Sequence, residues 1–435
     1  MPHRAKSSAV FIVAAMFIGC TLSRLGAQAR GSADHERTSN HAAALTAQGQ
    51  EAFQNGQLDE AKRLLQEAVR LEPRSARAHA LLGLTLARQE DIEGALANLK
   101  QARQIEPGNP DYAYDFAVLS VQARQFAAAV PILEALHRQS PQSDDVLVNL
   151  ARACAGAAEF GKLSTLIASL PAADYRNESL LKTLATVLAA ARQNGTLERM
   201  WQAAIHQDHN QPLPYAALAE LWTAQGHASR ALNLLESAPT AARGPLYLYA
   251  LGQSQLALRN YSEASESFRE ITRLMPGSEQ AWLQLIRSYL SGNQVALAET
   301  SAEDAARRFP GTDEFKYLQS VADYMLNRSA AAMEALAPVI HKAEQNDPRP
   351  VLLMAVLLSE SGKYQEAMDY FERAQKLELG CGALAAYFYG ATLLRAHRPQ
   401  DAAAQLQAAI RCRPHFALAE YRLGQGLEQS GKPRE

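Results

Sequence analysis

Residues 42–75 read AAALTAQGQEAFQNGQLDEAKRLLQEAVRLEPRS, and residues 76–109 read ARAHALLGLTLARQEDIEGALANLKQARQIEPGN. Aligned without a gap, both stretches have Gly at position 8, Ala at 20, Leu at 24, Ala at 27 and Pro at 32. A 34-residue period of this kind indicates an array of short structural repeats. The period therefore decides the fold.

The period continues along the chain. The units begin near Ala42, Ala76, Pro110, Asp144, Leu181, Pro212, Pro245, Glu279, Asp313, Pro348 and Ala383, with a last half unit from Ala417. Position 20 tests this register, because there a small side chain lets two helices cross closely. Ala stands there in nine of eleven units: Ala61, Ala95, Ala129, Ala231, Ala264, Ala298, Ala332, Ala367 and Ala402.

The fourth and fifth units are the exceptions. Leu163 and Met200 occupy position 20 there, Pro171 arrives early, and the sequence PAADYRNES lengthens the connection between the units. We expect a looser or tilted junction over residues 163–200.

Each unit has the pattern of two amphipathic helices joined near position 15 and separated from the next unit by Pro. The joining residues are Gly or Asn, which tolerate the positive φ of a helix stop: Asn55-Gly56, Asn194-Gly195, Gly226, Gly292-Asn293 and Gly362. The sequence therefore predicts an all-α solenoid of antiparallel helix pairs over residues 42–431, with a polar capping helix over residues 417–430.

The residues at positions 4, 7, 8, 20, 24, 27 and 32 resemble the tetratricopeptide repeat, and about eleven and a half such units cover the chain from Ala42 on. The resemblance implies a right-handed superhelix whose concave groove is lined by positions 2, 5, 9 and 12 of each first helix. In this register position 5 carries a row of tyrosines: Tyr114, Tyr249, Tyr317, Tyr387 and Tyr421. Position 9 carries Arg152 and Arg287 among polar residues of both charge signs.

These residues are the candidate partner-groove residues, since Tyr offers a large contact area with few rotors to freeze. The alternative is that the tyrosine rings pack against the next repeat. Chaperone-binding members of the family hold a terminal carboxylate with a set of Lys, Asn and Arg residues. Only Asn149 and Lys182 match that set, so we do not expect a carboxylate clamp.

The overall charge argues against a nucleic-acid partner. The chain has 43 Lys plus Arg against 45 Asp plus Glu and no long run of like charges. It therefore has no basic field for a phosphate backbone. The high apolar content, 48%, excludes wholesale disorder.

Residues 1–29 have the pattern of a secretory signal peptide. Arg4 and Lys6 precede an apolar run of eleven residues, too short to span a bilayer, and Ala27-Gln28-Ala29 offers a cleavage site. Residues 30–41 read as a flexible polar linker. We expect an exported protein, periplasmic or secreted. Alternatively, the sequence before Cys20 resembles a lipoprotein box, and lipidation of Cys20 would attach the chain to a membrane.

Motifs for catalysis or cofactors are absent or incomplete. Gly426–Pro433 approaches a phosphate-binding loop, but Pro433 replaces the hydroxyl residue that should hold magnesium. His206 and His209 could offer two metal ligands from one helical face, without an evident third. The sequence therefore predicts no cofactor, no metal and no enzyme activity.

Removal of the leader leaves three cysteines. Cys381 precedes the first helix of the eleventh unit and Cys412 follows its second helix, and antiparallel helices bring these two ends together. We expect a disulfide that closes a loop of 32 residues, although the helix from Ala417 could separate the pair. Cys154, at a helix-packing position, should be free and buried.

These observations favour a noncatalytic protein–protein interaction scaffold of the cell envelope, which binds a peptide or helix segment of another protein in the groove. The alternative is an accessory or regulatory subunit of a periplasmic glycan-handling or hydrolytic enzyme complex.

Overall fold

The computed structural model describes residues 36–343, 345–377 and 380–431, and the regular secondary structure in these residues is all helical. After a first helix over residues 36–54, the α-helices are α2 (Leu58–Leu71), α3 (Ala76–Arg88), α4 (Ile92–Ile105), α5 (Pro110–Gln122), α6 (Phe126–Gln139), α7 (Asp144–Gly156), α8 (Phe160–Ala168), α9 (Glu178–Ala190), α10 (Asn194–Gln207), α11 (Pro212–Ala224), α12 (Ala228–Glu236), α13 (Pro245–Ala257), α14 (Tyr261–Leu274), α15 (Glu279–Ser291), α16 (Val295–Arg308), α17 (Asp313–Met325), α18 (Ser329–Ala343), α19 (Pro348–Glu360), α20 (Tyr364–Leu377), α21 (Ala383–Arg395), α22 (Pro399–Cys412) and α23 (Ala417–Gln429).

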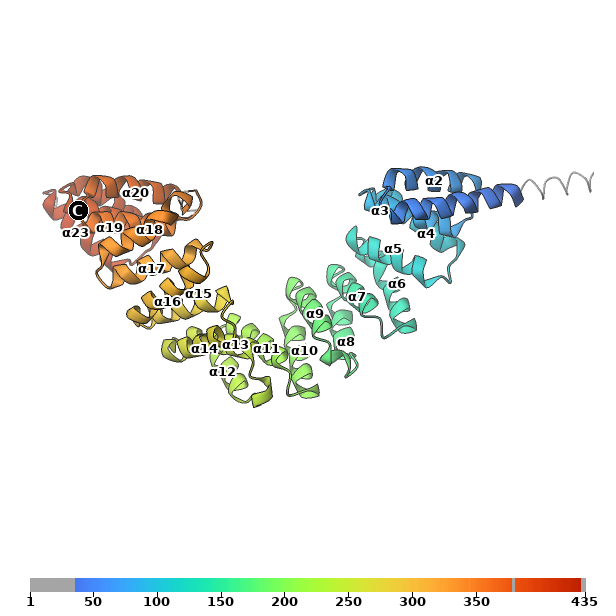
Figure 1. Ribbon diagram of the computed structural model, residues 1–435, viewed down its shortest axis with the longest axis horizontal. Coiled ribbons are helices and arrows are strands. Elements are labelled where there is room, and N and C mark those ends of the chain that lie inside the picture. Colours follow the sequence, from blue (N-terminus) through green and yellow to red (C-terminus); the bar gives the residue numbers. More distant parts are fainter. Residues whose placement is uncertain (1–35, 344, 378–379, 432–435) are drawn as a thin grey trace, which may run out of the picture. The chain divides into compact units, whose positions relative to one another are not determined.

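The helices form antiparallel pairs, which confirms the predicted all-α fold class (Figure 1). The chain divides into two units, one ending at Met200 and the other beginning at Trp201. Within each unit a helix packs on its neighbours along the chain. First helices of successive repeats also touch, as α5 touches α7 and α19 touches α21. Each repeat is therefore stabilised mainly by the adjacent repeats.

The two helices of a repeat cross where the sequence predicts. All nine alanines at position 20 are fully buried, and the residue four positions later is a buried Leu or Phe in most units, as in Leu65, Leu99, Phe268 and Leu406. Small residues at position 8 of the first helix receive these bulky side chains. A methyl group placed on Gly83 would lie 2.7 Å from Cγ of Leu99.

In every described repeat, a residue with positive φ stands at position 15, two residues after the end of the first helix. The prediction of Gly or Asn at this stop is correct for four of the five quoted sites, but elsewhere larger residues adopt the same left-handed conformation. These residues are Gly56, Glu90, Arg124, Ala158, Arg192, Gly226, Arg259, Asn293, Asn327, Gly362, His397 and Gly431. A non-glycine residue there costs about 1–2 kcal/mol, so packing of the repeats overrides a local preference.

The structure corrects the predicted register of the fifth unit. Its first helix, α9, begins at Glu178 and not at Leu181, which restores the 34-residue spacing from Asp144. The positive φ is accordingly at Arg192, and Asn194-Gly195 begins helix α10. Position 20 of this unit is Leu197 and not Met200.

The predicted linker is also partly wrong, because residues 36–41 are helical and belong to the first helix. The predicted leader, residues 1–29, and residues 30–35 lie outside the described residues. No helix in the described ranges is long and apolar enough to cross a membrane.

A shortened second helix occurs twice. Helices α8 and α12 have 9 residues, whereas most second helices have 14, and each is followed by a 3-10 turn, η1 (Asp174–Arg176) or η2 (Thr240–Ala242). The sequence analysis found the first irregularity through Pro171 and missed the second, although Ser237-Ala238-Pro239 repeats the pattern of Ser169-Leu170-Pro171.

A side chain within η1, and one directly after η2, compensates for the early helix end. The Tyr175 hydroxyl donates to the carbonyl of Ile167 at 3.2 Å, and Arg243 donates to the carbonyls of Ala238 and Glu236 at 3.1 and 3.2 Å. These bonds satisfy carbonyls that the missing helical turns would otherwise cover. The junction after α8 is therefore an ordered variant of the repeat.

Candidate functional site: the groove between helices α7 and α9

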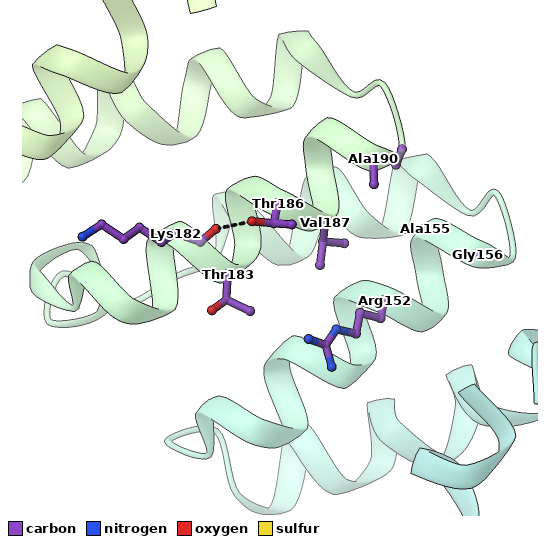
Figure 2. Close-up of a pocket in the computed structure, with 9 residues that line it drawn as sticks. Arg152, Ala155, Gly156, Lys182, Thr183, Thr186, Val187 and Ala190 are labelled. Atoms are coloured by element: carbon purple, nitrogen blue, oxygen red, sulfur yellow. Dashed lines mark hydrogen bonds between the residues drawn. The ribbon is translucent and has the colours of Figure 1, made fainter. Parts of the chain in front are cut away.

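The first helices of the fourth and fifth repeats, α7 and α9, line an open groove in the first unit. The cavity holds about 660 Å³, and Figure 2 shows its lining residues projecting from the two helices. Except for the two long cations Arg152 and Lys182, the lining residues have small side chains. These residues are Ala155, Gly156, Thr183, Thr186, Val187, Ala190 and Ala191. Because the floor is built from small apolar groups, the groove has room for the side chains of a bound segment.

Two cations stand on the rim of the groove. Arg152 from α7 and Lys182 from α9 are both exposed. Lys182 pairs with Glu178 on its own helix at 3.3 Å, whereas Arg152 has no ion-pair partner among the described residues. A guanidinium that is not neutralised beside an apolar floor favours a carboxylate on the occupant.

Two hydroxyls on the α9 wall add acceptors. Thr183 Oγ1 donates to the carbonyl of Ser179 at 2.9 Å, and Thr186 Oγ1 donates to the carbonyl of Lys182, also at 2.9 Å. Because each hydroxyl proton is engaged within the helix, the oxygens are left to accept hydrogen bonds from backbone N–H groups of a bound segment.

Tyr114, a candidate groove residue of the third repeat, is hydrogen-bonded to α7 but does not line this cavity. Asn149 Nδ2 on α7 donates to the hydroxyl of Tyr114 on α5 at 3.2 Å, and also to the carbonyl of Asp145 at 2.9 Å. Burial, with a smaller contribution from Asp145, raises the pKa of Tyr114. Its hydroxyl therefore stays protonated and polar at neutral pH.

The tyrosine row divides into two groups. Tyr114, Tyr249, Tyr317 and Tyr387 are half-buried against neighbouring side chains, mostly of the next repeat. Tyr249 accepts from Gln280 at 3.1 Å, the guanidinium of Arg349 lies 5.1 Å from the centre of the Tyr317 ring, and the rings of Tyr387 and Phe416 lie 5.1 Å apart. Only the member in the last described helix, Tyr421, is largely exposed, at 65%. The contacts of the first four give them a role in packing between repeats.

Arg287 lies in a charge network of the second unit. Its guanidinium pairs with Glu314 at 2.8 Å, and Glu314 also pairs with Arg349 at 2.9 Å. The cavity beside this network holds about 130 Å³, much less than the groove between α7 and α9. A partner that used Arg287 would have to compete with Glu314.

Cys381 and Cys412 are joined by a disulfide, and their Cα atoms lie 5.2 Å apart. The bond links the segment before α21 to the last residue of α22, and α23 does not separate the two cysteines. Cys154 is free and buried. Burial, with smaller contributions from Glu159 and Glu134, raises the pKa of its thiol to about 11.

The remaining sequence motifs form no site among the described residues. The His206 and His209 rings lie 6.3 Å apart, and in the described ranges no group of three or more potential ligands is placed to hold a metal. Gly426–Gly431 spans the end of α23 and its turn. Lys432 and Pro433 lie outside the described residues. Lys182 matched the carboxylate clamp only as the second residue of a unit that begins at Leu181. It is the fifth residue of α9, so the match is lost.

The sequence analysis missed seven of the nine residues that line the groove. It did not single out two residues on α7, four on α9 and the residue that follows α9: Ala155 and Gly156, Thr183, Thr186, Val187 and Ala190, and Ala191. The residues on and after α9 were missed because the fifth unit was numbered three residues too late. The signal was present, since a strict 34-residue step from Asp144 places Lys182 and Thr186 at positions 5 and 9 of the first helix.

Comparisons with known proteins agree with the repeat pattern. Residues 46–110 and 352–417 match the family model described as tetratricopeptide repeat, and residues 242–352 match the model of YfiO, described as an outer membrane lipoprotein. No curated protein shows a significant match. Both segments that match the tetratricopeptide repeat model lie within the array of repeated helix pairs.

Several solved structures are similar to the chain at low identity. Yeast Tom70 is 16% identical, with a TM-score of 0.42 over 91% of this chain and 96% of that chain. The APC/C Cut9–Hcn1 hetero-tetramer gives 13% identity and a TM-score of 0.42 over 90% and 91%. YrrB, described as a TPR protein with an unusual peptide-binding site, gives 18% identity and a TM-score of 0.31 over 51% and 96%.

Proposed function

We propose that this protein is a noncatalytic interaction scaffold of the cell envelope that binds a segment of another protein in the groove between α7 and α9. The observation that carries the proposal is the groove itself, an open cavity of about 660 Å³ between two first helices. Tetratricopeptide repeats serve protein–protein interaction, and here the small side chains of the groove leave space for a bound segment.

The chemistry of the rim specifies the segment. Arg152 favours a carboxylate, the hydroxyl oxygens of Thr183 and Thr186 favour backbone or side-chain donors, and Val187 favours an apolar side chain. A short segment with an acidic residue next to an apolar one satisfies all three features. Burial of the apolar residue supplies affinity, while the charge pair fixes the register.

Two features support an envelope location. The basic start, apolar run and Ala27-Gln28-Ala29 have the pattern of an export signal, and residues 242–352 resemble an outer membrane lipoprotein family. We infer export, with a mature chain that begins at Arg30. Lipidation of Cys20 would instead attach the scaffold to a membrane. Mass spectrometry of the N-terminal peptide distinguishes a free Arg30 from a diacylated Cys20.

Site-specific photocrosslinking in the intact cell tests the groove. A photoreactive amino acid at exposed Thr186 should crosslink a discrete partner, whereas the same group at exposed Lys376 on α20 should not. Arg152→Glu should weaken the Thr186 crosslink by about tenfold, as expected for loss of one charged anchor worth about 1–3 kcal/mol, and Lys376→Glu should leave it unchanged. Equal crosslinking from both positions, or no effect of Arg152→Glu, would contradict the proposal.

A further inference from the structure

A second large cavity of the first unit lies between the second helices of the second and third repeats, α4 and α6. It holds about 970 Å³, more than the groove between α7 and α9, and we call it the outer groove. Most of its lining is apolar and comes from both helices and from α5: Ile92, Leu96, Phe116, Ala128, Pro131 and Ile132. The outer groove therefore offers contact to the apolar side of a bound segment.

The side of α6 that lines the outer groove carries no long polar side chain that could close it. Ala128 and Pro131 are both exposed there. The next pair of second helices is different, because Lys162 on α8 reaches across to Glu134 on α6 and pairs with it at 3.0 Å. Among the described residues no ion pair joins α6 to α4. The outer groove is thus left open by the side chains of its own walls.

The charges of the outer groove are all on α4 and are ordered along it. Lys100 and Arg103 line the end toward the C-terminus of α4, and Glu93 lies about two turns before Lys100. None of the three has an ion-pair partner among the described residues. Cζ of Arg103 lies 5.3 Å from the centre of the Phe116 ring, a stacking that leaves the N–H edge of the guanidinium available to a carboxylate. The lining residues from α5 and α6 are uncharged.

The walls of the outer groove favour a helix over an extended segment. The backbone groups of α4 and α6 are largely bonded within their own helices, so they offer few partners to a bound backbone. An extended segment would press its own peptide groups, unpaired, against apolar side chains. A helix satisfies its peptide groups internally and can still place an apolar stripe in the groove.

The order of the charges favours one direction of that helix. Acidic residues are preferred in the first turn of a helix and basic residues in the last turn. A helix that lies antiparallel to α4 presents its first turn to Lys100 and Arg103 and its last turn to Glu93. The charge contacts and the dipole preference are then satisfied together, whereas a parallel helix would need acidic residues at its C-terminal end.

We propose that the outer groove binds an amphipathic helix of another protein, which lies antiparallel to α4. The partner helix carries Asp or Glu in its first turn, an apolar stripe along the groove, and Lys or Arg in its last turn. This site is separate from the groove between α7 and α9 and does not depend on that proposal.

A synthetic helix about three turns long is the probe, because Ile92 to Arg103 spans about 16 Å of α4. It carries Glu in its first turn, Leu along one side and Lys in its last turn. A lactam bridge on the opposite side holds it helical, and circular dichroism verifies this. Fluorescence anisotropy should show saturable binding to the full chain. A basic probe, in which Lys replaces the Glu residues, and a probe with Glu and Lys exchanged between its ends should each bind about tenfold more weakly or less.

Ala128→Leu should fill the outer groove and weaken probe binding by about tenfold or more. Because Ala128 is exposed and both residues are strong helix formers, this variant should melt close to the parent. Ala296→Leu is the matched control. Ala296 is also exposed and lies in the first turn of a second helix, α16, but in the second unit, so its replacement should leave binding unchanged.

Charge reversal supplies a second readout. Lys100→Glu with Arg103→Glu should weaken binding of the probe and strengthen binding of the basic probe, since the sign of the contact is exchanged. Lys376→Glu on α20 should change neither. Absence of saturable binding to the parent chain, equal binding by Ala128→Leu, or equal binding of the charge-exchanged probe would overturn the proposal.

Two further results would overturn the choice of partner. A parent dimer that dissociates in the Ala128→Leu variant during sedimentation would make a second copy the occupant. Saturable binding of decanoate to the parent chain, lost in Ala128→Leu and without binding of the helical probe, would make the occupant an anionic amphiphile.

Discussion

Alanine substitution of two glycines at the same repeat position should change stability in opposite directions. Gly390 and Gly424 both occupy position 8 of a first helix, 34 residues apart. A methyl group on Gly390 would lie 2.6 Å from Leu406 Cγ and 3.3 Å from the carbonyl oxygen of Ala402, whereas one on Gly424 would meet nothing within 4 Å. The pair therefore separates steric cost from helix propensity.

The magnitudes follow from two terms. Ala is favoured over Gly inside a helix by about 1 kcal/mol, and this gain applies to both sites. Overpacking costs about 1–3 kcal/mol, and only Gly390→Ala incurs it, because a backbone carbonyl and a fully buried Leu leave little room to relax. Gly424→Ala should stabilise α23 by about 1 kcal/mol, and Gly390→Ala should destabilise α21 and α22 by up to about 2 kcal/mol.

Native-state hydrogen exchange is the suitable assay, because long repeat arrays need not unfold in one step. Amides of α21 and α22 should exchange about tenfold faster in Gly390→Ala, since a tenfold change corresponds to about 1.4 kcal/mol. Amides of α23 should exchange several-fold more slowly in Gly424→Ala. If both variants slow exchange, or both accelerate it, the assignment of position 8 as a packing recess is wrong.

Three further predictions concern single features. Replacing Cys381 and Cys412 together with Ser should destabilise α21 and α22 by about 3–4 kcal/mol in the loop-entropy model, read as faster exchange that reductant also produces in the parent. Burial raises the pKa of the Cys154 thiol to about 11, from about 9 in the unfolded chain. The thiol's contribution to the unfolding free energy is therefore full below pH 9 and is lost as the pH rises toward 11. Urea unfolding at several pH values should show this loss in the parent chain and not in Cys154→Ala. Ala158→Gly should relieve the strain of a left-handed backbone conformation and stabilise α7 and α8 by up to about 1 kcal/mol. The control Ala157→Gly, at a residue whose φ is −78°, should destabilise the same helices. Amide hydrogen exchange in α7 and α8 should therefore become slower in the first variant and faster in the second.

The periodic part of the fold could be predicted from sequence because each periodic residue answers one packing need. Ala at position 20 permits the helix crossing, Gly at position 8 receives a bulky side chain, and Pro at position 32 separates units. Because these needs recur in every repeat, the repeats of one chain can be aligned with each other, and the alignment shows which residues meet them. Helix starts at Asp144, Pro212 and Ala417 were predicted correctly on this basis.

The departures from the period were harder to predict. The fifth unit was numbered from Leu181 because PAADYRNES reads as an insertion, whereas α8 is shorter by five residues and the turn η1 fills the difference. A shortened helix and a lengthened loop of equal size leave the period unchanged. Local sequence cannot separate that case from an insertion without the contact of Tyr175 with Ile167.

The role of a repeat residue is set by its neighbours more than by its identity. Tyr387 and Tyr421 occupy the same position on successive first helices, yet the ring of Tyr387 packs against Phe416 while Tyr421 is 65% exposed. Gly390 and Gly424 differ in the same way. A candidate binding site on such an array therefore lies where the repetition is interrupted, at the groove between α7 and α9, the two first helices that flank the shortened helix α8 in the chain. A regular row of tyrosines, although conspicuous in the sequence, is first explained by packing between repeats.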